Sequence, residues 1–145
     1  MRTTIQWITI GAVMSLPGLV GQANTAPPLS VEEQQHATSL KATITLRGGG
    51  KRTVVMEGVG CSSSICSRVS LNSSVPGGTA ITRTWLDSIA AIRDVSGADG
   101  LFVFKNGAQQ RLSVVPLNRV LYLKDPAGRP EKLDLAKIQS VEFGF

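Results

Sequence analysis

Cys61 and Cys66 are the two cysteines of the sequence, and four residues separate them. A pair at this spacing could form a local disulfide, a redox-active dithiol or half of a metal site. Thioredoxin-like redox motifs have two residues between their cysteines and place them at a helix N-terminus, and neither feature is found here. A metal site needs further His, Cys or acidic ligands, and the neighbouring sequence has no such cluster. We therefore predict a structural disulfide between Cys61 and Cys66, and no metal site.

The segment from Gly58 to Arg68 contains this pair and is the best candidate for a binding surface. Loops held on a rigid sheet often carry function, and a disulfide would preorganise this one. Closing so short a loop adds ~2 kcal/mol at most, so its effect would be local. The alternative is that the disulfide only fixes an insertion. The residues that we expect to contribute to binding are Gly58, Gly60, Ser62, Ser63 and Arg68.

No constellation of catalytic residues is evident. The cluster Ser62–Ser64 lacks the Gly-x-Ser-x-Gly pattern of a nucleophile elbow. The single histidine, His36, lies on a polar segment, where we expect a solvated side chain. Most acidic residues fall in expected turns or helix starts, where carboxylates have capping roles. We therefore predict no catalytic residue and no cofactor, with a small hydrolase or a thiol–disulfide oxidoreductase as the alternative.

Residues 1–23 have the pattern of a signal peptide. Arg2 precedes a short apolar run, Ile5–Leu16, and small residues lead to an expected cut after Ala23 or, alternatively, after Ala26. The run is short for a hydrocarbon core of ~30 Å, although an uncleaved membrane anchor is the competing interpretation. We expect export to the periplasm or the extracellular space, with no transmembrane segment after cleavage.

The charge of the mature chain suggests what its partners are. The sequence has 15 basic and 10 acidic residues, and residues 1–23 contain one Arg and no acid, which leaves 14 − 10 = +4. A mildly basic exported protein is attracted to anionic surfaces or acidic polysaccharides, although such a charge also serves solubility. Phe102, Phe104 and Arg111 could resemble a nucleic-acid surface, but buried strand core explains the rings better. We expect an unknown envelope or extracellular partner, protein or polysaccharide, and not nucleic acid.

Composition indicates a folded domain rich in turns. Hydrophobic residues make up 42% and charged residues 17%, which excludes a disordered polyampholyte, and 15 Gly with 7 Pro favour short strands. We expect a flexible or weakly helical leader over residues 24–40. Within it, Ser30 and Glu33 have the capping-box spacing, which allows a short helix over 31–39. Residues 41–145 should form a single β-rich domain.

Alternating sequence predicts two hairpins and two further strands. The first hairpin is 42–46 with 52–56 around Gly48–Gly50, and the second is 101–104 with 111–115 around Asn106-Gly107. Strands are also expected at 120–123 and 141–145, and one helical turn at 133–138. Residues 71–82 have a loop composition and are predicted to be a connection.

A second capping box predicts the other helix. Thr84 and Asp87 have the required spacing, and Trp85, Ile89 and Ile92 follow at helical intervals, so we expect one to three turns that face the core. The alternative for the end of this segment is a strand that takes over around residues 92–95, at a boundary that the sequence does not fix.

The two halves of the sequence repeat their features in the same order. Each half has a hairpin whose return strand begins with Arg, Arg52 or Arg111, and later a Leu-Asp pair, at Leu86 or Leu133. These offsets are 59 and 47, so the first half would carry an insertion, for which the cysteine segment is the candidate. The pattern resembles SH3-like or Sm-like barrels in architecture only.

Taken together, the sequence predicts a mainly β fold. We expect a small antiparallel barrel or sandwich, built from two duplicated β-meanders with one or two short helices. The predicted function is an exported, non-catalytic binding or structural module. A small secreted enzyme and an inhibitor or accessory subunit are the alternatives.

Overall fold

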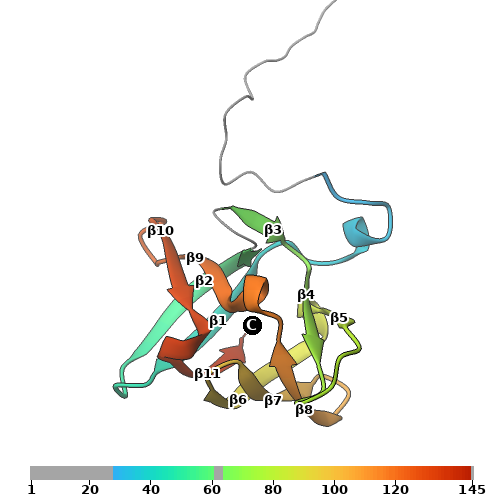
Figure 1. Ribbon diagram of the computed structural model, residues 1–145. Coiled ribbons are helices and arrows are strands. Elements are labelled where there is room, and N and C mark those ends of the chain that lie inside the picture. Colours follow the sequence, from blue (N-terminus) through green and yellow to red (C-terminus); the bar gives the residue numbers. More distant parts are fainter. Residues whose placement is uncertain (1–27, 61–63, 145) are drawn as a thin grey trace, which may run out of the picture.

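A computed structural model describes residues 28–60 and 64–144 of the chain, so the predicted signal peptide lies outside the described residues. Eleven strands form one antiparallel sheet, which confirms the predicted mainly β fold (Figure 1). The strands are β1 Leu40–Leu46, β2 Lys51–Gly60, β3 Ile65–Ser67, β4 Ser70–Ser74, β5 Thr82–Trp85, β6 Ile89–Ser96, β7 Asp99–Phe104, β8 Gln109–Val114, β9 Val120–Lys124, β10 Pro130–Asp134 and β11 Ile138–Phe143.

The helices in the described ranges are short 3₁₀ turns. They are η2 Glu33–Gln35, η3 Leu86–Ser88, η4 Pro116–Arg119 and η5 Leu135–Lys137. No helix in residues 28–60 and 64–144 has the length and apolar character needed to cross a membrane.

Both predicted hairpins are confirmed, as β1–β2 and β7–β8. Their turns have the same backbone hydrogen bonds, from Gly49 N–H to Leu46 O and from Gly107 N–H to Phe104 O. Gly107 has a φ of 92°, a conformation that favours glycine. In β1 the alternation that predicted the strand places Ile44 in the core and leaves its neighbours Thr43 and Thr45 half-buried.

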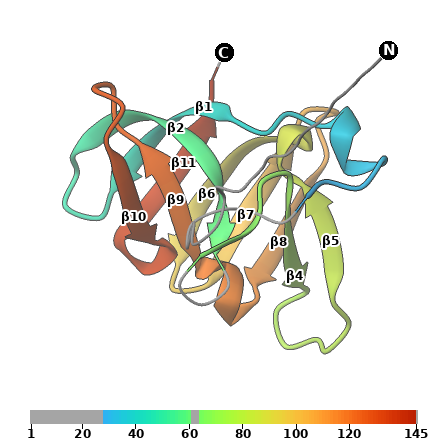
Figure 2. The ribbon, with the colours of Figure 1, turned by 90° about the horizontal axis from the view of Figure 1, so that it is seen from above.

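The strand order is β10-β9-β2-β1-β11-β6-β7-β8-β4-β5, with β3 paired to β2 off this path. The path ends at β10 and β5, so the sheet is not closed into the barrel that was one of the predicted forms. Instead the sheet curves strongly, and its two walls face each other (Figure 2). Side chains from both walls form one hydrophobic core, for example Ile44, Phe102 and Leu123.

The strand order repeats the predicted duplication. The order is symmetric about its centre, between β11 and β6. Strands at equal distances from the centre are equivalent: β6 and β11, β1 and β7, β2 and β8, β4 and β9, β5 and β10. Two links between the halves are exchanged in the same way, because β2 pairs with β9 and β8 pairs with β4. The chain is therefore two topologically equivalent halves whose strands interlock, and β3 has no counterpart.

The pairing register identifies equivalent residues. Ile44 pairs with Val141 and Phe102 pairs with Ile92, which makes Ile44 and Phe102 equivalent at an offset of 102 − 44 = 58. The 3₁₀ turns η3 and η5 begin at Leu86 and Leu135, at an offset of 135 − 86 = 49. A matching hydrogen bond joins each hairpin turn to the other half's 3₁₀ turn, from Arg47 N–H to Lys137 O and from Lys105 N–H to Ser88 O.

This register corrects the predicted alignment of the halves. Leu86 matches Leu135 and not Leu133, because Leu133-Asp134 ends β10 before the 3₁₀ turn whereas Leu86-Asp87 lies inside it. Arg52 pairs with Ile44, and Gln110 pairs with the equivalent Phe102, so Arg52 corresponds to Gln110 and not to Arg111.

The extra residues of the first half lie where the sequence predicted them. Between the equivalent core positions, Met56 to Leu71 spans 71 − 56 = 15 residues and Val114 to Leu121 spans 121 − 114 = 7. The difference of eight residues accommodates β3 and the cysteine segment.

One local prediction is wrong, and another holds only in part. Residues 71–82 are not only a connection, because β4 and β5 form a hairpin there, with Leu71 and Ser73 buried. The expected helix after Thr84 is reduced to η3, and β6 begins at Ile89. The core residues of β6 recur at helical spacing because its pairing with β7 shifts register twice, and such irregularities change which face a strand residue occupies.

Two short turns are close to prediction. One 3₁₀ turn, η5, lies within 133–138, and the Asp134 side chain caps it by accepting a hydrogen bond from Ala136 N–H. In the leader the capping box forms between Ser30 and Glu33, but the helix is limited to the three residues of η2.

Candidate functional site

Two clefts occupy equivalent places in the two halves. The β9–β10 cleft, about 330 Å³, lies where β9 and β10 meet β2 and β3. The β4–β5 cleft, about 350 Å³, lies where β4 and β5 meet β8 and η4. Four equivalent pairs line both clefts: Tyr122 and Asn72, Lys132 and Arg83, Glu57 and Val115, Arg68 and Asn118. The repeat therefore produces two sites of related geometry and different chemistry.

The carboxylates of the β9–β10 cleft are neutralised from outside it. Arg52 makes a two-point contact with Glu131, with Nη1 2.6 Å from Oε2, and Lys124 Nζ lies 3.3 Å from a Glu57 carboxylate oxygen. The hydrogen bonds from Arg52 hold the pKa of Glu131 below its ordinary value. Glu131 is thus a charged but paired acid at neutral pH.

The cations of the same cleft have no such partner. Arg68 and Lys132 are exposed, and neither forms an ion pair with any carboxylate in the described part of the chain. The Lys132 ammonium lies 5.9 Å from the ring centroid of Tyr122, on the neighbouring strand. Because its acids are paired and these two cations are not, the cleft is electropositive.

Tyr122 is the most unusual side chain of this cleft. It is 6% exposed, and within the described residues its buried hydroxyl has no hydrogen-bond partner. A buried hydroxyl without a partner costs about 1–3 kcal/mol, so its retention suggests that a ligand supplies the missing acceptor. The ring packs directly against the backbone of Gly60. A Cβ at that position would lie 2.7 Å from Tyr122 Cε1, so only glycine leaves room for the ring.

The structure separates the predicted binding residues by role. Gly58 and Gly60 are buried at the end of β2, where they shape the backbone. Gly58 has a φ of 151°, and a Cβ there would lie 2.4 Å from Ser67 O. Arg68 is exposed and lines the β9–β10 cleft.

The remaining candidates of that segment are not placed. Cys61, Ser62 and Ser63 lie outside the described residues, and the disulfide between Cys61 and Cys66 stays a prediction. Sequence reasoning missed Tyr122 and Lys132, which the β9–β10 pairing brings opposite each other. The only signal available was that Tyr122 is the single tyrosine of the chain.

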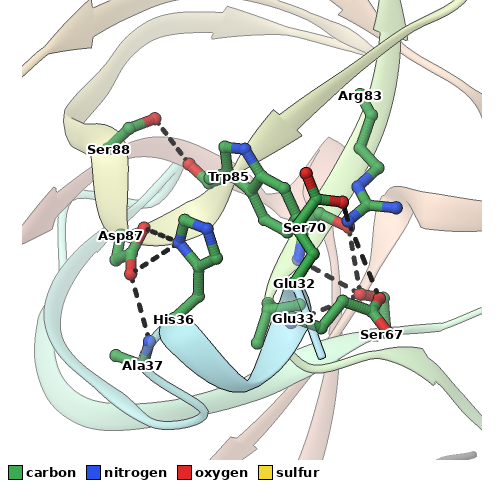
Figure 3. A network of polar contacts seen from close by, with 11 residues as sticks. Glu32, Glu33, His36, Ala37, Ser67, Ser70, Arg83, Trp85, Asp87 and Ser88 are labelled. Atoms are coloured by element: carbon green, nitrogen blue, oxygen red, sulfur yellow. Dashed lines mark hydrogen bonds and ion pairs between the residues drawn. The ribbon is translucent and has the colours of Figure 1, made fainter. Parts of the chain in front are cut away.

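The chain's own N-terminal segment, residues 30–37, lies beside the β4–β5 cleft and contributes Glu33 to its wall. Figure 3 shows the polar contacts of this segment. Glu33 lines this cleft, and Arg83 Nη2 lies 3.6 Å from Glu32 Oε1 and 3.9 Å from Glu33 Oε2. Arg83 also lies over Trp85, with Cζ 4.1 Å from the ring centroid. The segment therefore places its acidic residues at the cation of this cleft.

His36 fixes the other end of the segment, and the prediction of a solvated side chain is wrong. Its ring stacks on Trp85 at 3.8 Å between centroids, with 7° between the planes. Its Nδ1 lies 2.9 and 3.0 Å from the two Asp87 carboxylate oxygens, and Ala37 N–H donates to Asp87 at 3.1 Å. In Figure 3 the indole lies between the imidazole and the Arg83 guanidinium.

Opposing effects act on the pKa of Asp87. Burial raises it, whereas the hydrogen bonds from His36 and Ala37 lower it, and the net shift is downward. Asp87 is therefore ionised at neutral pH, and His36 Nδ1 donates to it. The carboxylate binds the N-terminal segment and does not cap a helix with Thr84, as the sequence had suggested.

Serines near the His36–Asp87 pair, within the described residues, hydrogen-bond to other groups. Ser67 Oγ lies 3.2 Å from Ser70 Oγ, and Ser88 Oγ donates to Trp85 O at 2.7 Å. The same ranges contain no group of three His, Cys, Asp or Glu that could hold a metal ion.

Comparison with known proteins gave no match: no family model, no curated protein and no solved structure is significantly similar to the chain.

Proposed function

We propose that the chain is an exported, non-catalytic binding module and that its ligand binds in the β9–β10 cleft. The observation that carries the proposal is the buried Tyr122 hydroxyl, which has no partner within the described residues and belongs to the lining of this cleft. A ligand acceptor at this hydroxyl would recover the free energy that its burial costs.

The electrostatics of the cleft support the same conclusion. Within the described residues Arg68 and Lys132 have no carboxylate partner, whereas Glu57 and Glu131 are neutralised by cations beside the cleft. A cleft of about 330 Å³ is at the small end of the usual range for ligand sites, about 300–1,000 Å³.

Export is the second part of the proposal, and it rests on the pattern of residues 1–23. The first residue of the protein recovered from outside the cytoplasm tests it. We expect Asn24 or Pro27 as the new N-terminus, and recovery of the full-length chain from the cytosol contradicts export.

An enzyme is the competing class. A thiol–disulfide oxidoreductase would hold Cys61 and Cys66 as reactive thiols with a depressed pKa, which a thiol titration of the folded protein measures. We expect no titratable thiol, because the proposal treats the pair as a structural disulfide.

Binding is tested by amide hydrogen exchange of residues 24–145. The protein is incubated separately with envelope proteins and with envelope polysaccharides from the cell that makes it. We expect one fraction to slow exchange in residues 120–134, which form β9, β10 and their turn. Unchanged exchange in this segment with both fractions contradicts the proposal.

Two double variants make this experiment specific. Arg68→Glu with Lys132→Glu reverses the unpaired charges of the cleft and should abolish the protection. Arg111→Glu with Lys137→Glu changes the net charge equally at exposed positions outside both clefts and should retain it. Equal protection in the two double variants would place the ligand elsewhere.

A further inference from the structure

We infer that the β9–β10 cleft binds an acidic peptide segment, with glutamate carboxylates at Arg68 and Lys132, in the way that Arg83 of the β4–β5 cleft pairs with the chain's own Glu32 and Glu33. This inference rests on the proposed function, since it names the ligand class of the same cleft.

The two clefts carry a cation at equivalent positions. Lys132 lies opposite Tyr122 across the β10–β9 pair, and Arg83 lies opposite Asn72 across the β5–β4 pair. These pairs occupy matched places in the two halves. Lys132 therefore presents a cation in the β9–β10 cleft where Arg83 presents one in the β4–β5 cleft.

The cation of the β4–β5 cleft is already paired with acidic peptide. A short turn, held by the capping box between Ser30 and Glu33, brings two adjacent carboxylates to Arg83 at the wall of this cleft. The chain thus contains one example of an acidic peptide bound by the cation of this type of cleft.

The two clefts differ in the number of cations and in whether those cations already have carboxylate partners. The β4–β5 cleft has one arginine, and it is already engaged, whereas Arg68 and Lys132 have no carboxylate partner in the described residues. The Tyr122 hydroxyl adds a buried donor that Asn72 does not reproduce. Two cations and one donor suit a pair of carboxylates better than a single anion.

The chain's own leader is not the expected occupant of the β9–β10 cleft. Its His36 requires Trp85 and Asp87, and the position equivalent to Trp85 is Asp134, which caps η5. A peptide that lacks His36 cannot make the contacts with Trp85 and Asp87 that hold the leader beside the β4–β5 cleft. It keeps Glu32 and Glu33, whose carboxylates can pair with the cations of either cleft.

The test uses a synthetic peptide of residues 28–35, Pro-Leu-Ser-Val-Glu-Glu-Gln-Gln. ¹⁵N-labelled residues 24–145 are titrated with this peptide and with a matched peptide that carries Gln in place of both glutamates. We expect saturable shifts of the Tyr122 and Lys132 amides, and about tenfold weaker binding of the Gln peptide, since bonds to charged groups contribute about 1.5–3 kcal/mol.

Variants identify the cations. Arg68→Gln and Lys132→Gln should each weaken binding of the acidic peptide about tenfold, whereas Lys137→Gln, an exposed lysine outside both clefts, should leave it unchanged. The dispersion of each variant's spectrum shows that it is folded.

Three outcomes overturn the inference. They are equal affinity for the two peptides, shifts confined to Asn72 and Arg83, and no binding of the acidic peptide. If polygalacturonate shifts the Tyr122 and Lys132 amides where the peptide does not, the peptide assignment fails and the proposed binding cleft stands. If the peptide or polygalacturonate binds saturably but shifts neither the Tyr122 amide nor the Lys132 amide, the proposed function fails as well.

Discussion

At the scale of single residues, Tyr122 and Gly60 define the centre of the β9–β10 cleft. The phenol ring lies so close to Gly60 that no side chain fits there, and its hydroxyl is buried without a partner in the described chain. Natural proteins rarely leave a buried polar group unpaired, so such a group is informative about function.

Replacing the hydroxyl separates stability from binding. Tyr122→Phe removes an unpaired group and leaves the ring, so we expect a free energy of unfolding that is unchanged or higher by up to about 1 kcal/mol. Ligand affinity should fall, because the donor is lost. Urea denaturation and the peptide titration measure the two effects, and a large loss of stability would show that the hydroxyl already has a partner.

The close approach at Gly60 has a matched control in Gly48. Gly60→Ala places a Cβ 2.7 Å from Tyr122 and should lower the free energy of unfolding by about 1–3 kcal/mol. Gly48→Ala meets nothing within 4 Å and should change it little. Equal effects in thermal or urea unfolding would contradict the packing described here.

Residue patterns in the sequence identified only part of this site. Arg68 was found because it follows the cysteine segment. Tyr122 and Lys132 come together through strand pairing at a distance of ten residues, and β10 carries no strong strand pattern, with Pro130 and three charged residues among its five. Such a pair is recognised only when the register is known.

At the scale of elements, the N-terminal segment acts as a strap across η3 and β5. His36 and Ala37 bind Asp87, and Glu32 and Glu33 reach Arg83. The capping box that predicted a helix instead shapes the short turn that fits this place. Sequence patterns located this turn, but not its contacts, which join residues about fifty positions apart.

The strap should be released by acid. The folded-state pKa of Asp87 lies below the ordinary 3.8, so its contribution to docking is present above about pH 3.8 and is lost as the pH falls through the lower folded-state value. Trp85 is the one tryptophan of residues 24–145, and its fluorescence reports the stacked His36. We expect an emission change on acidification, together with easier quenching by acrylamide.

Variants separate Asp87 from the acids of the strap. The pKa of Glu33 is also lowered, first because it accepts a hydrogen bond from Ser30 N–H, so acid acts on its carboxylate as well. Asp87→Asn should give the released emission already at neutral pH, whereas the exposed Asp94→Asn should behave like the parent protein. An Asp87→Asn protein with parental emission would contradict the role of this contact.

At the scale of the whole molecule, two equivalent halves exchange strands around one core. The sequence predicted the duplication and the position of the insertion, because hairpin turns and apolar strands recur in order. The exchange could not be predicted, since it depends on pairings such as β2 with β9 and β8 with β4 that no local pattern records. The expected extension of the helix beyond Ser88 has the same origin, because the irregular pairing of β6 imitates helical spacing.

The interlocked topology predicts that the halves need each other. Fragments 24–97 and 98–145 each lack the partners of their central strands, and we expect both to be unfolded alone by circular dichroism. Mixed together, they should form a 1:1 complex with the β-sheet spectrum of the parent protein. Cooperative folding of either fragment as a monomer would contradict the exchange.

The β9–β10 cleft binds an acidic peptide, whereas the cation of the β4–β5 cleft is paired with the strap. Paramagnetic relaxation enhancement with a spin label on the acidic peptide of residues 28–35 distinguishes the two clefts. We expect the label to broaden the amides of Tyr122 and Lys132 and to leave those of Asn72 and Arg83 sharp. Broadening at Asn72 and Arg83 alone, or at neither pair in the presence of saturating peptide, would contradict this expectation.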